Sequence, residues 1–257
     1  MLEISTPGVT LCCQGGMNDC RIQLLGETTT LTVTGESFTL SNISLMGGGY
    51  VYPASQLTIM SNGTHTIDGC GFYHDPNNGG QGMVYINTLG DVVIRNSVFA
   101  HGYAGLGITN AATVTIQSTE FRNNTSHGLL TELQPPRNLG TDGQILYITN
   151  SAFVENKGSG ILSTNLGLLP RLSILETEFS WEGPDPYYGA AGTFCCPESY
   201  GEINFVGNFG TPNSTYDNPY TCNGFFFWEY PILEGDSFGT EMTYCVDVNE
   251  DIMGNLV

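Results

Sequence analysis

Two histidines and a neighbouring aspartate are the residues best suited to metal binding or proton transfer. His74 and His101 stand 27 residues apart, and Asp75 directly follows the first of them. Imidazole and carboxylate groups can together bind a metal ion or exchange a proton near neutral pH. One hypothesis is therefore a metal or proton-transfer site formed by His74, His101 and Asp75. The alternative is a polar turn that happens to contain two histidines.

A second group of residues combines carboxylates with aromatic rings in the segment 176–188. Aromatic faces stack on sugar rings and carboxylates bind Ca²⁺, so this segment predicts a carbohydrate-binding patch, with Ca²⁺ as the candidate cofactor. An ordinary surface loop around Gly183 and Pro184 would account for the same residues. The candidate carbohydrate-binding residues are Trp181, Glu182, Asp185, Tyr187 and Tyr188.

The eight cysteines form a front group of four and a back group of four. Zinc sites usually contain two closely spaced Cys or His pairs, and neither the cysteines nor the four histidines have that spacing. An even number of cysteines favours disulfides, and we expect them within each group, with the pairing open. The residues are Cys12, Cys13, Cys20 and Cys70 at the front and Cys195, Cys196, Cys222 and Cys245 at the back.

Asn-x-Ser/Thr sequons point to a secretory compartment, where N-glycosylation takes place. A chain rich in Asn, Ser and Thr also acquires some sequons by chance. Asn123 and Asn124 overlap, so one of them at most is expected to carry a glycan in any one molecule. The candidate glycosylation sites are Asn62, Asn123, Asn124 and Asn213, and a fifth sequon begins at Asn42.

The charge balance is strongly acidic, with 25 Asp and Glu residues, six Lys and Arg residues and a formal net charge of −19. It argues against nucleic acid as a partner, because phosphate binding needs clustered Lys and Arg. No apolar run reaches the roughly 18 residues that span a membrane. Residues 1–10 lack the basic and apolar regions of a signal peptide, so we expect a mature form or an excerpt of an extracellular protein.

The sequence contains an internal repeat of about 27 residues, and His74 and His101 stand at the same position in two of its copies. An aliphatic anchor is followed five positions later by Phe or another apolar residue, as in Ile94 and Phe99. Strand-forming residues precede the anchor, a Gly such as Gly128 or Gly160 follows, and no copy has a helical period. The anchors are Leu40, Ile67, Ile94, Ile116, Ile148 and Ile174, with a looser copy at Ile203, Phe205 and Phe209.

Strands that recur at this interval without helices can pair in parallel with equivalent strands one coil away. The sequence therefore predicts an all-β parallel β-helix of about seven rungs, roughly 4.8 Å apart, with the anchors stacked inside. Asn42, Asn96 and Asn150 each stand two positions after an anchor. Stacked Asn side chains can form a ladder at a tight left-handed bend, and an inward ladder would bury the Asn42 sequon.

Rungs such as 94–99 and 148–153 resemble those of the right-handed parallel β-helix family, which includes pectate lyases, polygalacturonases, some phage tailspikes and extracellular wall proteins. The resemblance covers roughly residues 20 to 210 and implies the fold without fixing a function. The Asp-Asp, Gly-His-Gly and Arg-x-Lys motifs of the family's hydrolases are absent. Its lyases need a base beside Ca²⁺-binding aspartates, and Arg95, Arg122 and Lys157 have no such cluster. We therefore assign no catalytic residue.

The two ends of the predicted solenoid differ from its middle. Open strand edges invite association, and we expect the segment 12–20 to close the front. From Gly210 the repeat is lost, and the aromatic run 225–230 must be buried in a cap tethered by disulfides or against a neighbouring subunit. We therefore expect a β-helix with an N-terminal Cys-rich cap over 1–210 and a C-terminal aromatic and acidic cap or interface segment over 211–257.

Three functions are compatible with these features. The sequence favours an extracellular structural glycoprotein, a rigid rod that self-associates into a fibril, appendage or cell covering. The alternatives are a polysaccharide-degrading lyase or hydrolase and a non-catalytic carbohydrate-binding adhesin.

Overall fold

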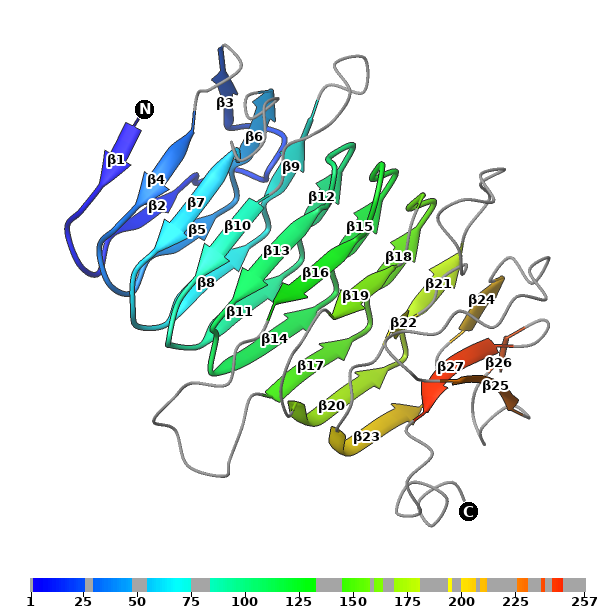
Figure 1. Ribbon diagram of the computed structural model, residues 1–257. Helices are drawn as coiled ribbons and strands as arrows, with labels where there is room; N and C mark the ends of the chain where they lie inside the picture. Colours follow the sequence, from blue (N-terminus) through cyan, green and yellow to red (C-terminus); the bar gives the residue numbers. More distant parts are fainter. Residues whose placement is uncertain are drawn as a thin grey trace.

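The computed structural model describes residues 2–25, 30–47, 55–74, 84–132, 145–157, 160–163 and 169–180. Beyond these it describes the short segments 194–195, 200–206, 209–211, 226–230, 237–238 and 242–246. Every helix or strand that it contains in these ranges is a β-strand. Figure 1 shows the strands wound into successive coils, with each coil contributing a strand to each of three sheets.

Sheets A and B each contain eight strands. Sheet A consists of β1 (Leu2–Ile4), β4 (Leu31–Val33), β7 (Leu57–Met60), β10 (Val84–Asn87), β13 (Leu106–Thr109), β16 (Leu129–Glu132), β19 (Ile161–Ser163) and β22 (Phe194–Cys195). Sheet B consists of β2 (Thr10–Cys12), β5 (Thr39–Ser41), β8 (His65–Asp68), β11 (Val92–Arg95), β14 (Thr113–Gln117), β17 (Ile145–Thr149), β20 (Leu169–Leu175) and β23 (Tyr200–Val206).

Sheet C forms the third side, and a separate pair of strands lies near the C-terminal end of the chain. Sheet C consists of β3 (Arg21–Leu24), β6 (Ser44–Gly47), β9 (Gly71–Tyr73), β12 (Val98–Ala100), β15 (Glu120–Arg122), β18 (Ala152–Val154), β21 (Glu178–Ser180), β24 (Phe209–Thr211) and β26 (Ser237–Phe238). The separate pair, β25 (Phe226–Tyr230) and β27 (Met242–Val246), is antiparallel.

Strands of neighbouring coils are parallel and in register, which confirms the predicted solenoid. In sheet B the anchor Ile94 pairs with Ile67 on one side and with Ile116 on the other. One coil was missed from the sequence, because Leu11 pairs with Leu40 and so opens the series before the first predicted anchor. The looser last copy is also shifted, since Ile174 pairs with Phe205 rather than with Ile203.

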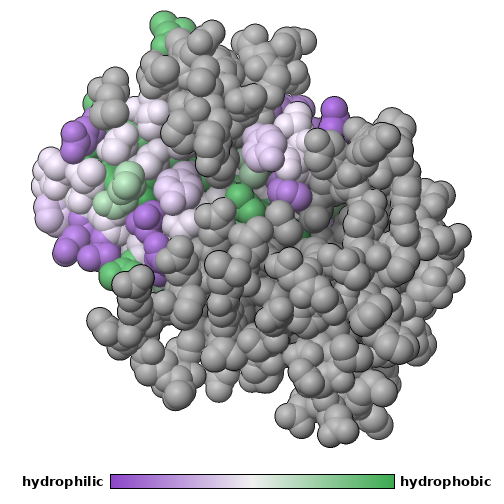
Figure 2. Space-filling view, in the orientation of Figure 1, coloured by the Kyte–Doolittle hydropathy of each residue, from purple (hydrophilic) through white to green (hydrophobic). Residues whose placement is uncertain are grey.

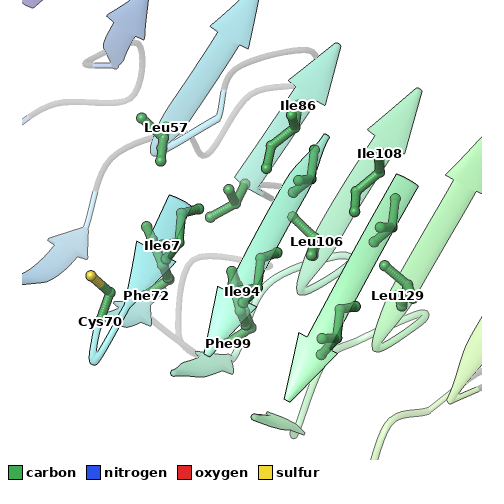
Figure 3. Close-up of a cluster of buried hydrophobic side chains, with 14 of the residues drawn as sticks. Leu57, Ile67, Cys70, Phe72, Ile86, Ile94, Phe99, Leu106, Ile108 and Leu129 are labelled. Carbon is green, nitrogen blue, oxygen red and sulfur yellow. The ribbon is translucent and has the colours of Figure 1, made fainter. Parts of the chain in front are cut away.

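Alternation along each strand places the core inside the coils. In β11, Val92 and Ile94 are buried while Val93 between them is partly exposed. Figure 3 shows aliphatic side chains from successive coils pointing into this shared interior. Burying each such side chain contributes about 1.5–3 kcal/mol, so the repeated anchors account for much of the stability.

Phenylalanines of sheet C form a continuous stack inside the coils. The rings of Phe72, Phe99, Phe121 and Phe153 are parallel, with centroids 4.8, 5.0 and 4.8 Å apart. This spacing is close to the distance between parallel strands, so in-register pairing places each ring directly on the next. The Phe five positions after an anchor therefore stacks on the Phe of the next coil and fills the interior beside sheet C.

The corner between sheets B and C has the predicted left-handed backbone, but no inward asparagine ladder. Asn42, Asn96 and Asn150 have φ values of 58°, 50° and 48°. Asn96 and Asn150 are exposed and Asn42 is partly buried, so the side chains of this column point away from the core. The condition under which the Asn42 sequon would be buried, a ladder that faces inward, is therefore not met.

A buried amide ladder exists at the corner between sheets C and A instead. Asn124 Nδ2 donates to Asn156 Oδ1 at 2.8 Å, and Asn156 Nδ2 donates to the Phe121 carbonyl at 2.9 Å. Asn124 Oδ1 in turn accepts the Gly102 N–H at 3.0 Å. The two amides thus tie neighbouring coils together where the chain leaves sheet C.

Gly128 and Gly160, the predicted turn before each strand of sheet A, lie at the same corner. A Cβ atom on Gly128 would stand 2.7 Å from the Gly160 carbonyl oxygen and 2.7 Å from Phe153 Cδ1. Because a backbone oxygen cannot move aside easily, the close approach of the coils requires glycine here.

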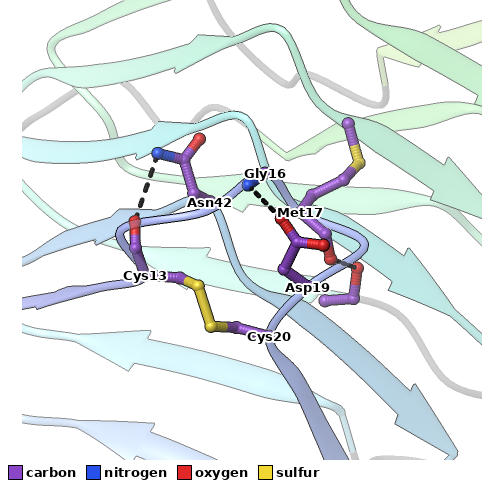
Figure 4. The surroundings of a disulfide bond; sticks show 7 residues. Cys13, Gly16, Met17, Asp19, Cys20 and Asn42 are labelled. Carbon is purple, nitrogen blue, oxygen red and sulfur yellow. Dashed lines mark hydrogen bonds between the residues drawn. A yellow bond between two sulfur atoms is a disulfide. The ribbon is translucent and has the colours of Figure 1, made fainter.

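One disulfide is present among the front cysteines. Cys13 and Cys20 are bonded and close the loop between β2 and β3 (Figure 4). Cys12 is a free, exposed thiol and Cys70 a free, buried one, so the expectation that all four pair within the front group was wrong. The Cys70 thiol donates to the Leu40 and Asp68 carbonyls, and burial raises its pKa to about 11.

The back cysteines and the aromatic run lie mostly outside the described residues. The backbones of Cys195 and Cys245 belong to β22 and β27, while Cys196 and Cys222 are not described. Within the run 225–230, β25 pairs with β27, which places the aromatic segment in a hairpin-like pair.

Candidate functional site

The two candidate histidines lie at the ends of neighbouring strands of sheet C. The His74 N–H donates to the Ala100 carbonyl at 3.1 Å, and the His101 N–H donates to the Arg122 carbonyl at 3.3 Å. Their backbones therefore occupy adjacent coils, as the repeat predicted. The His74 side chain is only 4% exposed, whereas His101 is partly exposed and has a left-handed φ of 63°.

Electrostatics at His101 favour the neutral imidazole. Burial lowers the pKa of His101, and the nearby Arg122 guanidinium lowers it further. A neutral imidazole is the metal-binding form, but the same guanidinium opposes the approach of a cation. In the ranges that the structure describes, no three His, Cys, Asp or Glu side chains are grouped as a metal site requires. Asp75 lies outside those ranges, so a metal site at His74, His101 and Asp75 stays a prediction.

The candidate carbohydrate-binding residues cannot be placed in the fold. Trp181, Glu182, Asp185, Tyr187 and Tyr188 all follow β21 and lie outside the described residues. The carbohydrate-binding patch, with its candidate Ca²⁺, also stays a prediction.

The candidate glycosylation sites differ sharply in their surroundings. Asn62 is exposed in the turn between β7 and β8, and Asn123 is partly buried with a left-handed φ of 54°. Asn124 has no exposed surface, because its amide belongs to the buried ladder with Asn156. A glycan on Asn124 Nδ2 is incompatible with this packing, so the expectation for Asn124 needs correction. Asn213 lies outside the described residues.

His65 is a buried histidine that the sequence reasoning left aside. Its Nδ1 accepts the Phe38 N–H at 3.3 Å, so Nε2 carries the proton and donates to the Ser61 carbonyl at 3.0 Å. The bond to Phe38 joins two coils, and the bond to Ser61 closes the turn before β8. The sequence signal that could have found it is its place two residues before the anchor Ile67, an inward position in β8.

A column of hydroxyl groups lies beneath the corner between sheets B and C. Ser97, Thr119 and Ser151 each donate to the carbonyl two residues earlier, at 2.6, 2.9 and 2.9 Å. The Ser97 and Ser151 hydroxyls also accept an N–H from the preceding coil. Cys70 occupies the equivalent position one coil earlier, which explains why a free thiol is buried there.

This architecture of in-register coils defines a parallel β-helix. A family model described as the right handed beta helix region matches residues 31–180, which is more than half of the 257 residues. The chain therefore belongs to the right-handed β-helix family, as its rungs predicted. Searches of curated proteins and of solved structures found no significant match.

The described surface carries hydrophobic residues mainly as single side chains. Figure 2 shows mostly hydrophilic or weakly polar residues on the described part of one face, with smaller green areas between them. Among the described residues, the exposed large hydrophobic side chains are Leu2, Leu25, Met60, Leu89 and Tyr103. No helix in the described ranges is both long enough and apolar enough to cross a membrane.

Proposed function

We propose that this chain is an extracellular structural protein, a rigid β-helical rod that associates with further copies of itself. The observation that carries the proposal is the continuity of its internal columns. The ring stack of Phe72, Phe99, Phe121 and Phe153 runs through four consecutive coils, the hydroxyl column of Ser97, Thr119 and Ser151 runs through three, and the amide ladder joins two. Together with the strand pairing of the three sheets, these columns join each of these coils to its neighbours, which is what a structural rod needs.

The edges of the sheets support self-association. Within the described residues, β1, β2 and β3 are paired on one side only, and Leu2 beside them is 57% exposed. Unpaired edges of parallel strands can extend onto a second chain by the same backbone hydrogen bonds.

Three features support an extracellular location for the rod. The Cys13–Cys20 disulfide is stable in an oxidising compartment, and the Asn62 sequon is exposed and accessible to glycosylation. The strongly acidic charge keeps an extended surface soluble. The enzyme and adhesin alternatives are less well supported, because no metal-binding group of three side chains forms among the described residues, and Asp75 and Trp181 lie outside them.

The proposal is tested with the full chain, purified without reduction. Sedimentation velocity over a range of concentrations, followed by negative-stain electron microscopy, is expected to show elongated oligomers or filaments. A strictly monomeric particle at every concentration would contradict self-association. Release of reducing ends or unsaturated products from a panel of uronate and neutral glycans would point to the enzyme instead.

A further inference from the structure

An open groove follows the outside of the corner between sheets B and C across four coils. One wall consists of the left-handed column Asn96, Ser118, Asn150 and Glu176, all of them exposed. The half-buried side chains of sheet C, among them Val98 and Ala152, line the rest. The groove thus runs parallel to the axis of the coils, where an extended chain could lie.

The wall of the groove presents polar groups that the fold does not use. The N–H groups of Asn96, Ser118 and Asn150 donate to carbonyls on the next coil, so the backbone there is satisfied. In the described part of the chain, the side chains of Ser118, Asn150 and Glu176 take part in no hydrogen bond or ion pair. They are free to receive a ligand.

The charge of the groove is negative. Glu120, Glu176 and Glu178 contribute carboxylates to its lining. Glu120 lies two coils before the other two, which corresponds to roughly 10 Å along the axis. Arg122 Nη1 stands 3.4 Å from Glu120 Oε1 and partly offsets the charge at that end, while Glu176 is exposed.

We propose that this groove binds an extended basic peptide segment of a partner protein. A segment in the polyproline II conformation rises about 3.1 Å per residue with three residues per turn. Two Lys or Arg side chains three positions apart then lie on one face and match the roughly 10 Å along the axis between the coils of Glu120 and Glu176. The amide of Asn150 lies on the coil between the two carboxylates, the hydroxyl of Ser118 lies on the coil of Glu120, and both can bond to the peptide backbone. The overall charge of −19 speeds the approach of a basic partner. The proposal is independent of self-association.

The test uses two fluorescein-labelled peptides of equal charge, Lys-Ala-Ala-Lys and Lys-Lys-Ala-Ala, with the full chain at low salt. Fluorescence anisotropy is expected to show about threefold tighter binding of Lys-Ala-Ala-Lys, since only its lysines match the carboxylate spacing. Glu120→Gln with Glu176→Gln should weaken that binding about fivefold. Arg122→Gln should strengthen it, because a competing cation is removed.

The matched control is Glu36→Gln with Asp91→Asn, which removes the same charge from exposed turns between sheets A and B. It should change the affinity by less than about twofold. Equal weakening by both double variants, equal affinity for both peptides, or no binding at millimolar peptide would overturn the proposal. Thermal melts followed by circular dichroism establish that each variant is folded, and each variant changes exposed or half-exposed side chains only.

Discussion

Single residues in this chain act mainly by joining one coil to the next. His65 is buried between the Phe38 N–H and the Ser61 carbonyl, and Asn124 holds Gly102 and Asn156. At the surface, Asp68 accepts from Asn96 Nδ2 at 2.9 Å and pairs with Arg95 Nη2 at 3.1 Å. The surface pair is solvated and contributes little, whereas the buried groups are costly to leave unpaired.

His65 should make the fold sensitive to acid. Burial lowers its pKa below the ordinary value of 6.5, although the bond to Ser61 offsets part of the effect. The unfolded chain therefore takes up the proton at a higher pH than the folded chain. Stability is complete above about pH 6.5 and falls at lower pH, by at most about 1.4 kcal/mol per pH unit, until the folded pKa is reached.

Urea unfolding between pH 8 and pH 5 measures this effect. The His65→Gln variant should be less stable at pH 8, and the stability gap between it and the unmodified protein should narrow as the pH falls. A gap that stays constant over this range would show that His65 does not titrate differently in the two states.

Asn124 should be required for stability and should carry no glycan. Asn124→Ala leaves the Gly102 N–H without its acceptor and leaves Asn156 Oδ1 with only the residue 124 backbone N–H as donor. We therefore expect a loss of about 1–3 kcal/mol in unfolding free energy. Glycopeptide mapping of protein secreted from a eukaryotic host should find the glycan at Asn62 and none at Asn124. A glycan on Asn124 in folded protein would contradict the buried ladder.

At the scale of elements, the fold repeats one unit in which strands of three sheets are joined by narrow corners. The pairing of Ile94 with Ile67 and Ile116 keeps equivalent side chains in columns. In sheet C the column consists of buried Phe rings, each stacked on the ring of the next coil. Removing one ring should therefore remove packing contacts with the Phe rings of both neighbouring coils.

Phe121 lies within the stack and should be one of its most sensitive positions. Phe121→Ala is expected to reduce the unfolding free energy by about 3–5 kcal/mol, and Phe121→Leu by less, because Leu fills part of the cavity. The control is Thr115→Ala on the partly exposed outer side of sheet B, which should cost under about 1 kcal/mol. Equal losses for Phe121→Ala and Thr115→Ala in urea unfolding would rule out a packed stack.

The repeat could be predicted from the sequence in the coils that contain both an aliphatic anchor and an apolar residue five positions after it. Ile94 and Phe99 show the pattern, and their columns are confirmed. The first coil was missed because the position five residues after Leu11 is Gly16, in the disulfide loop. The left-handed bend at Asn42, Asn96 and Asn150 is confirmed, but the direction of their side chains could not be predicted, because residue type alone does not show on which side of such a bend a side chain lies.

The candidate site was harder to predict than the fold. The repeat predicted that the backbones of His74 and His101 lie on adjacent coils. It could not predict that the His74 side chain is buried, or that Arg122 lowers the pKa of His101. The groove at the corner between sheets B and C was invisible, since its carboxylates come from coils that are far apart in sequence. Glu120 and Glu176 line the same groove only because the chain coils.

At the scale of the whole molecule, the chain is a stack of coils with a net charge of −19. Backbone pairing along the axis joins each described strand of the three sheets to its counterpart on the neighbouring coil. Membership of the right-handed β-helix family accounts for the architecture. The proposed rod and the proposed basic partner use different surfaces of it.

The in-register stacking of coils is tested most directly by distances along one outward column of sheet B. Thr39, Thr66, Val93, Thr115 and Tyr147 pair in succession on five consecutive strands and are partly exposed. Nitroxide labels would be attached through unnatural amino acids at Thr39 and at each of the others in turn. The stacking predicts that the electron paramagnetic resonance distance rises by about 4.8 Å per coil, to roughly 19 Å between positions 39 and 147. Distances that do not follow the number of coils would contradict it.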